Sequence, residues 1–175
     1  GDYSLAQEAY NNFLAKSDTP LTLPDSILGE SISFAINAIN NPIAIKVKPL
    51  AAEVNRFPLQ YFPVLTIDKQ RIYYTRRLGT GVQYDEDIMM ASKENGSWQK
   101  SQSVSNSINT DYNEGACAVS ADGRTMILTI CEGRQTYGNC DLFISKLEEG
   151  DWTSPKNLGR QVNSPFWDSQ PSLSA

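Results

Sequence analysis

The stretch Ala116-Cys-Ala-Val-Ser-Ala-Asp-Gly-Arg-Thr-Met-Ile-Leu-Thr-Ile130 decides the fold. Its first part, residues 116–120, is a short and nearly apolar run that suits a strand buried on both faces. Asp122 and Gly123 follow, and these residue types tolerate the backbone angles of a tight reversal. Residues 125–130 then predict a second strand, because β-branched and long aliphatic side chains favour extended backbone. A strand, a turn and a strand in direct succession indicate an antiparallel sheet.

The same pattern recurs at a fixed distance along the chain. Asn55, Asn109 and Asn163 are spaced 54 residues apart (109 − 55 and 163 − 109). The same offset, without a gap, pairs further residues: Asp68 with Asp122, Thr75 with Thr129, Gly79 with Gly133, and Gly96-x-Trp98 with Gly150-x-Trp152. Agreement at so many positions predicts an internal structural repeat.

Each copy of the repeat predicts four short strands. In the first copy they cover residues 63–66, 71–76, 87–92 and 98–104, and in the second 116–120, 125–130, 141–146 and 152–158. Four strands in a unit of about 50 residues are typical of β-propeller blades. We therefore expect a mainly β chain with a partial β-propeller of four-stranded blades over residues 43–175: blade one at 50–104, blade two at 105–158, and the start of a truncated blade at 159–175.

A propeller blade has two apolar faces and must stack on neighbours to bury them. Two blades and a fraction leave a face and an edge open, so we expect the remaining blades of a longer protein, or another chain, to cover the open blade. Residues 43–49 lie one repeat before the outer strand of blade one. They are predicted to be an outer strand that closes the ring in the full-length protein.

The N-terminal residues 1–42 show helical periodicity instead. Between residues 3 and 16 the apolar side chains fall on one helical face. Pro20 and Pro24 interrupt it, Asp25 or Ser26 is expected to cap a second helix, and Pro42 ends that helix. The segment is predicted to be a helical hairpin, either packed beside the propeller or forming the end of a tetratricopeptide array.

Cys131 and Cys140 bracket the loop between the second and third strands of blade two, where blade one has Arg77 and Glu86. Because such positions can face each other across a hairpin, we predict a disulfide, which implies an oxidising compartment. The alternative is two separate buried thiols. Cys117, on the inner strand, is predicted to be a small core residue.

Composition excludes several classes of function. The 175 residues contain no histidine, which rules out imidazole-based catalysis and Cys/His zinc sites. A formal net charge of −5 argues against a nucleic-acid partner. No apolar run is long enough for a membrane-spanning helix, and no leader segment is recognisable at Gly1. The sequence predicts neither a cofactor nor a metal.

Four stretches resemble a known family: Tyr61-Phe-Pro-Val-Leu-Thr-Ile-Asp68, Ser120-Ala-Asp-Gly-Arg124, Cys140-Asp-Leu-Phe143 and Trp167-Asp-Ser-Gln-Pro-Ser-Leu-Ser-Ala175. They are similar to the TolB-type, WD-repeat-like propellers of Bacteroidetes OmpA-family envelope proteins, which combine tetratricopeptide helices, a propeller and a peptidoglycan-binding domain. One branch of that family belongs to the type IX secretion system. The resemblance implies a non-catalytic scaffold that binds other cell-envelope proteins in the periplasm, associated with the outer membrane. The peptidoglycan-binding domain lies outside the resembling stretch.

The residues just before each inner strand are expected to face the funnel where propellers bind ligands. They are Gln60, Glu114 and Asp168, spaced by the repeat. We predict binding contacts at Tyr112, Glu114, Trp167 and Asp168, of which Tyr112 and Trp167 lie in loops that lead to the funnel. Two carboxylates there could instead form the acid/base pair of a carbohydrate-active enzyme, or simply cap loops.

A second acidic feature is Asp85-Glu86-Asp87, which could offer hard oxygen ligands to calcium. Asp87 has a repeat partner in Asp141, however, so we interpret it as a structural residue of the repeat. Glu114 and Asp168 are repeat equivalents as well and are likewise interpreted as structural residues, so the chain is expected not to be an enzyme.

Overall fold

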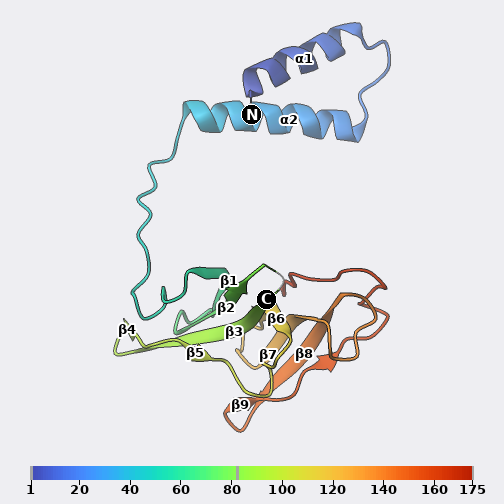
Figure 1. Cartoon of the computed structure of the whole chain (residues 1–175). Helices are drawn as coiled ribbons and strands as arrows, with labels where there is room; N and C mark the ends of the chain where they lie inside the picture. The colour runs from blue at the N-terminus through green and yellow to red at the C-terminus, as the bar shows by residue number, and fades with distance from the viewer. Residues whose placement is uncertain (1, 82, 175) are drawn as a thin grey trace. The chain divides into compact units, whose positions relative to one another are not determined.

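The structure is a computed structural model that describes residues 2–81 and 83–174. It contains two compact units, Gly1–Lys48 and Pro49–Ala175. The first is helical and the second is built of β-sheets (Figure 1). The boundary falls between residues 48 and 49, inside the segment predicted as the closing strand.

The helical unit is a pair of helices, α1 (Tyr3–Lys16) and α2 (Leu23–Asn40). Tyr10 of α1 lies against Gly29 of α2, where an added Cβ atom would come within 2.5 Å of the Tyr10 hydroxyl oxygen. That hydroxyl donates to the carbonyl oxygen of Asp25 at 3.0 Å. The predicted capping residue was wrong: Thr22 caps α2, and Asp25 bonds back to the backbone of Thr22. Pro24 fits the first turn of α2, because a first-turn residue needs no hydrogen-bonded N–H group.

The first sheet comprises β1 (Leu59–Leu65), β2 (Arg71–Thr80), β3 (Gln83–Glu94), β4 (Ser97–Trp98) and β5 (Gln102–Ser103). All its pairings are antiparallel: β2 lies between β1 and β3, while β4 and β5 both pair with β3. The turn between β1 and β2 is closed by side chains, since Asp68 accepts hydrogen bonds from Thr66 and from the N–H of Gln70.

The second sheet has the same arrangement. Its strands are β6 (Asn113–Val119), β7 (Thr125–Cys131), β8 (Cys140–Glu148), β9 (Asp151–Trp152) and β10 (Lys156–Asn157). The register also corresponds, because Thr75 lies opposite Ile88 in the first sheet and Thr129 opposite Leu142 in the second. Residues 54 apart therefore occupy the same strand positions in the two sheets.

Three features differ from the predicted strands. The first strand of each copy begins earlier than predicted, at Leu59 and at Asn113, so Gln60 and Glu114 lie within β1 and β6 and not before them. The outer strand of each copy is split in two, because the register against its neighbour changes by one residue between Trp98 and Gln102, and again between Trp152 and Lys156. In the first copy, the β2–β3 hairpin extends beyond the predicted strands to Thr80 and Gln83.

The two sheets share one core. Met126, Leu128 and Phe143 of the second sheet pack against Tyr73 and Ile88 of the first. On the opposite face of the first sheet, a second cluster contains Ile72, Tyr74 and Met89, which are the repeat equivalents of Met126, Leu128 and Phe143. The face of the second sheet that carries Met126, Leu128 and Phe143 therefore packs against the first sheet. The equivalent face of the first sheet, with Ile72, Tyr74 and Met89, points away from the second sheet.

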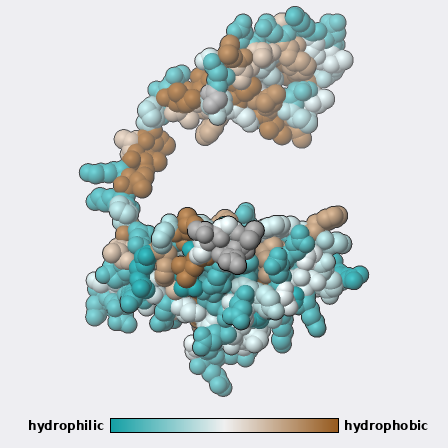
Figure 2. Space-filling model, viewed as in Figure 1, coloured by the Kyte–Doolittle hydropathy of each residue, from teal (hydrophilic) through white to brown (hydrophobic). Residues whose placement is uncertain are grey.

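Residues 43–49 form no strand and are exposed. Figure 2 shows apolar side chains at the surface of this segment, which includes Ile43, Ile45 and Val47. A strand needs a neighbour for its backbone groups, and the segment pairs with no described strand. Its role in closing a ring stays a prediction. Within the described residues, no helix has the length and apolar character to cross a membrane.

Candidate functional site

We call the first strand of each copy, β1 and β6, and the corresponding segment around Gln170 the inner strands. They carry an unusual backbone feature at the same repeat position. Phe62, Ala116 and Gln170, each 54 residues apart, have positive φ angles of 53°, 35° and 57°. In β1 and β6 the strand register shifts there, as at a β-bulge. A positive φ is costly for residues other than glycine and needs support from the surrounding structure.

For Ala116 and Gln170 that support comes from the preceding sheet. The N–H of Ala116 donates to the hydroxyl oxygen of Thr75 at 3.0 Å, and the N–H of Gln170 donates to that of Thr129 at 3.3 Å. Because Thr75 and Thr129 are also repeat equivalents, these two segments are held by the sheet before them in the same way. The segment around Gln170 meets the second sheet in the way that the second sheet meets the first.

A cleft of about 490 Å³ opens where these three inner segments meet. We call it the inner-strand cleft. Its volume falls in the range of ordinary ligand sites. It is lined by equivalent positions of successive copies, among them Tyr61 and Gly115, and Phe62, Ala116 and Gln170. Its aromatic lining residues are Tyr61, Phe62, Tyr84 and Trp167.

A polar network crosses the wall formed by the first sheet. Arg77 and Glu86 lie opposite each other on β2 and β3, with their nearest side-chain nitrogen and oxygen 3.9 Å apart. The hydroxyl of Tyr61 donates to Glu86. The guanidinium carbon of Arg77 lies 3.7 Å from the ring centre of Tyr84, in cation–π contact. Burial, together with the carboxylate of Glu86, raises the pKa of Tyr61, so the phenol remains a hydrogen-bond donor.

The second sheet carries a covalent link at the equivalent positions. Cys131 and Cys140 face each other on β7 and β8 and are joined by a disulfide. Both residues line the cleft. Cys140 also forms a parallel bridge with Trp167, so the disulfide lies next to the segment that supplies the most exposed aromatic ring of the cleft.

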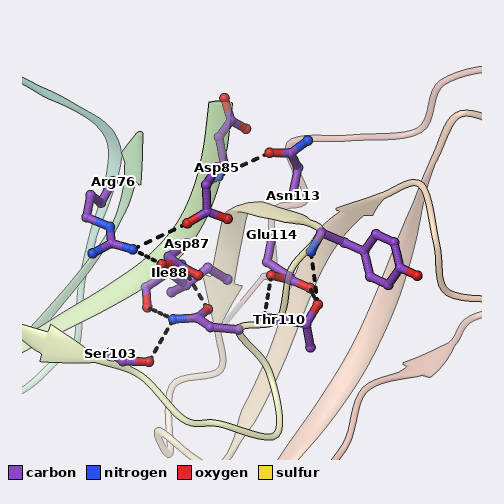
Figure 3. Close-up of polar contacts among 11 residues, drawn as sticks. Arg76, Asp85, Asp87, Ile88, Ser103, Thr110, Asn113 and Glu114 are labelled. Carbon is purple, nitrogen blue, oxygen red and sulfur yellow. Dashed lines mark hydrogen bonds and ion pairs between the residues drawn. The ribbon is translucent and has the colours of Figure 1, made fainter. Parts of the chain in front are cut away.

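Of the four predicted binding residues, Trp167 lines the cleft and is 65% exposed. Tyr112 packs its ring over Gly133 instead. Glu114 and Asp168 are engaged by the loops next to them. Glu114 accepts from the N–H and hydroxyl of Thr110 (Figure 3). Asp168 accepts from the same groups of Ser164. Neither carboxylate is among the groups that line the cleft.

The acidic stretch on β3 divides between two faces, because side chains alternate along a strand. Asp85 and Asp87 flank the guanidinium of Arg76 (Figure 3), while Glu86 points into the cleft network. Over residues 2–81 and 83–174, no three acidic or sulfur side chains gather as a metal site would require. The calcium interpretation therefore lacks a converging set of oxygen ligands.

Glu114 is fully buried, and burial raises its pKa to about 7 against the opposing effect of its Thr110 hydrogen bonds. The folded state then binds more protons than the unfolded state between pH 4.5, the ordinary pKa, and about 7. We expect the free energy of unfolding to fall as pH rises through this window, by roughly 3 kcal/mol. Denaturant titrations of wild type and Glu114→Gln at pH 5 and pH 8 would measure it. Relative to wild type, Glu114→Gln should have a higher free energy of unfolding at pH 8 than at pH 5. The same difference in free energy at both pH values would contradict the prediction.

Sequence reasoning missed most of the cleft. Tyr61, Phe62, Arg77, Tyr84 and Glu86 were not among the predicted binding residues. Tyr61 lies one position beyond Gln60, and a shift of one residue in a strand moves a side chain to the other face. One signal in the sequence could have indicated the cleft. Tyr61, Gly115 and Ser169 share a repeat position yet differ in side chain, whereas several structural residues of the repeat are the same in each copy.

Comparison with known proteins adds one distant likeness. Neither a family model nor a curated protein sequence matches the chain. The crystal structure of the tricorn protease is similar over 63% of this chain and 12% of that chain, with a TM-score of 0.37 and 14% sequence identity. This chain thus spans far less than two thirds of that protein, and a likeness at this level carries no argument about activity.

Proposed function

We propose that the β unit is part of a β-propeller and serves as a non-catalytic, protein-binding scaffold module of a bacterial cell-envelope protein. The two sheets would be consecutive blades, and residues 159–175 would begin the next. The way the two sheets stack supports this assignment. The second sheet packs one of its faces on the first, and the first sheet leaves its own equivalent face available for another sheet, so the stack can be extended by further copies. The remaining blades, or another chain, would cover the open ends.

The exposed rings of Phe62, Tyr84 and Trp167 around the inner-strand cleft carry the proposal. Aromatic side chains are enriched at protein interfaces, where they bury a large area at low entropic cost. The carbohydrate-active alternative would need carboxylates directed at a substrate. Glu114 and Asp168 are engaged by Thr110 and Ser164, which weighs against that alternative.

Two observations support a location in the envelope. The disulfide between Cys131 and Cys140 suits an oxidising compartment such as the periplasm. The stretches that resemble TolB-type propellers of the OmpA family suggest an outer-membrane-associated protein that binds other envelope proteins, with type IX secretion as one such process. The helical unit would then correspond to the tetratricopeptide part.

Photo-crosslinking in the native host tests the proposal. A benzophenone amino acid at position 167 should give a covalent protein adduct in the envelope fraction on irradiation. The same probe at Asn95, an exposed hairpin turn at the far end of β3, is the matched control and should give none. Adducts that form equally at both positions would contradict a specific interface. Sugar hydrolysis that Glu114→Gln abolishes would overturn the proposal in favour of the enzyme.

A further inference from the structure

We propose that the inner-strand cleft binds an extended, proline-containing segment of a partner protein in the polyproline II conformation. This inference rests on the proposed function, because it specifies what the binding module holds. It follows from three properties of the cleft: its charge, its open hydrogen-bonding groups and its aromatic walls.

The charges of the cleft favour a neutral ligand. Arg77 and Glu86 neutralise each other, and the hydroxyl of Tyr61 adds a hydrogen bond to Glu86. A cationic ligand would have to compete with Arg77 for this carboxylate. An anionic ligand would meet both Glu86 and Glu132, which also lines the cleft. A segment without charged side chains avoids both costs.

Beside the acceptor oxygens of Glu86 and Glu132, three side chains that line the cleft offer hydrogen-bond donors. Asn113 uses its side-chain oxygen to accept the N–H of Glu86 at 3.1 Å (Figure 3), so its amino group is directed elsewhere. The guanidinium of Arg77 lies over the ring of Tyr84, and its 3.9 Å separation from Glu86 exceeds hydrogen-bond length. The indole of Trp167 has an N–H and no acceptor. These groups call for a ligand rich in acceptors.

Proline supplies acceptors without donors, because its residue has a carbonyl oxygen but no N–H. In the polyproline II helix these carbonyls make no internal hydrogen bonds and remain free to accept. Saccharide hydroxyls bring a donor with every acceptor, so they match a wall of donors less well. An ordinary extended peptide likewise brings an N–H with each carbonyl.

The rings provide flat apolar walls for proline side chains. Phe62, Tyr84 and Trp167 come from β1, β3 and the segment after β10, and are 42%, 37% and 65% exposed. Aromatic-lined grooves of this kind are a recurring means of binding polyproline II segments, which lose little entropy because they are already extended.

Calorimetric titration of the whole chain tests the inference. The ligand is a decaproline peptide blocked at both ends, with a blocked Gly-Ser peptide of equal length and maltotriose as comparison ligands. We expect decaproline alone to bind. Trp167→Ala should weaken its affinity roughly tenfold, as for a central aromatic contact. Phe166→Ala is the matched control, because Phe166 is adjacent, 77% exposed and not part of the cleft lining, and it should leave the affinity unchanged.

A second variant separates folding from binding. Arg77→Lys keeps the charge but loses the contact of the guanidinium with the Tyr84 ring and the fork of donors, so decaproline binding should weaken while the unfolding midpoint stays close to wild type. The inference is overturned if decaproline does not bind, if maltotriose or the Gly-Ser peptide binds equally well, or if Phe166→Ala weakens binding as much as Trp167→Ala. A protein adduct at position 167 in the crosslinking experiment would then still uphold the scaffold proposal, with a ligand of another class.

Discussion

Asn109→Ala is expected to lower the free energy of unfolding of the β unit by about 3 kcal/mol. The Asn109 side chain accepts from the N–H of Ile88 at 3.0 Å and donates to the carbonyl oxygen of Ile88 at 2.8 Å and to the hydroxyl of Ser103 at 2.9 Å. It thereby completes the hydrogen bonding of β3 in place of a neighbouring strand. Ile88 is fully buried, so alanine would leave its N–H without a partner in the core.

The repeat supplies both a second test and a control. Asn163 makes the equivalent pair of bonds to Leu142, at 2.8 and 2.9 Å, and Asn163→Ala should cost a similar amount. Asn55 occupies the same repeat position, but among the described residues no sheet precedes it; it is exposed and bonds locally to Leu50 and Gln60. Asn55→Ala should therefore cost less than about 1 kcal/mol.

Urea titration followed by tryptophan fluorescence measures these effects. Trp98, Trp152 and Trp167 are the three tryptophans of the sequence, and all lie in the β unit, so the signal reports its unfolding and not that of the helices. Equal losses for Asn55→Ala and Asn109→Ala would refute the idea that this asparagine joins one sheet to the next.

Replacing both Cys131 and Cys140 by serine is expected to destabilise the β unit by roughly 2–3 kcal/mol. The disulfide spans a sequence separation of 9 and restricts the unfolded chain. It also closes a loop that packs tightly onto the next copy: the N–H of Asn139 donates to the carbonyl oxygen of Phe166 at 2.9 Å. Opening the loop should therefore loosen the segment that carries Trp167.

The equivalent link in the first sheet provides the comparison. Arg77 and Glu86 occupy the positions of the two cysteines, as a partly exposed pair 3.9 Å apart. An ion pair of this kind contributes at most about 1 kcal/mol, so Arg77→Gln with Glu86→Gln should cost less than the serine double variant. Thermal unfolding with and without a reducing agent tests the disulfide directly: wild type should lose stability on reduction, and the serine variant should not respond. A wild-type midpoint that reduction leaves unchanged would contradict the prediction.

The number and order of the strands before the outer edge of each sheet, and the turns between them, followed from the sequence because they depend on neighbouring residues. The split outer strands, the length of the β2–β3 hairpin and the strand expected at residues 43–49 did not. Asp68 and Asp122 marked turns that their side chains do close, by bonds to Thr66 and Ser120. The cap of α2 was misplaced for an equally local reason. Thr22 was passed over because Pro24 was taken as a stop, although proline is well accommodated in the first turn of a helix.

The inner-strand cleft could not be read in this way. Its residues come from both sheets and from the segment after β10, and they meet only when the sheets stack. Phe62 and Ala116 adopt positive φ angles that their residue types do not suggest, and the hydroxyl of Thr75 holds Ala116 from another strand. The sequence by itself determined the repeat, its strands and turns and the candidate cysteine pair, since these reflect short-range preferences and a period that can be counted. Tertiary structure alone decided which side chains border the cleft, because a strand bulge and the stacking of sheets set the direction of each side chain through contacts between residues far apart in the chain.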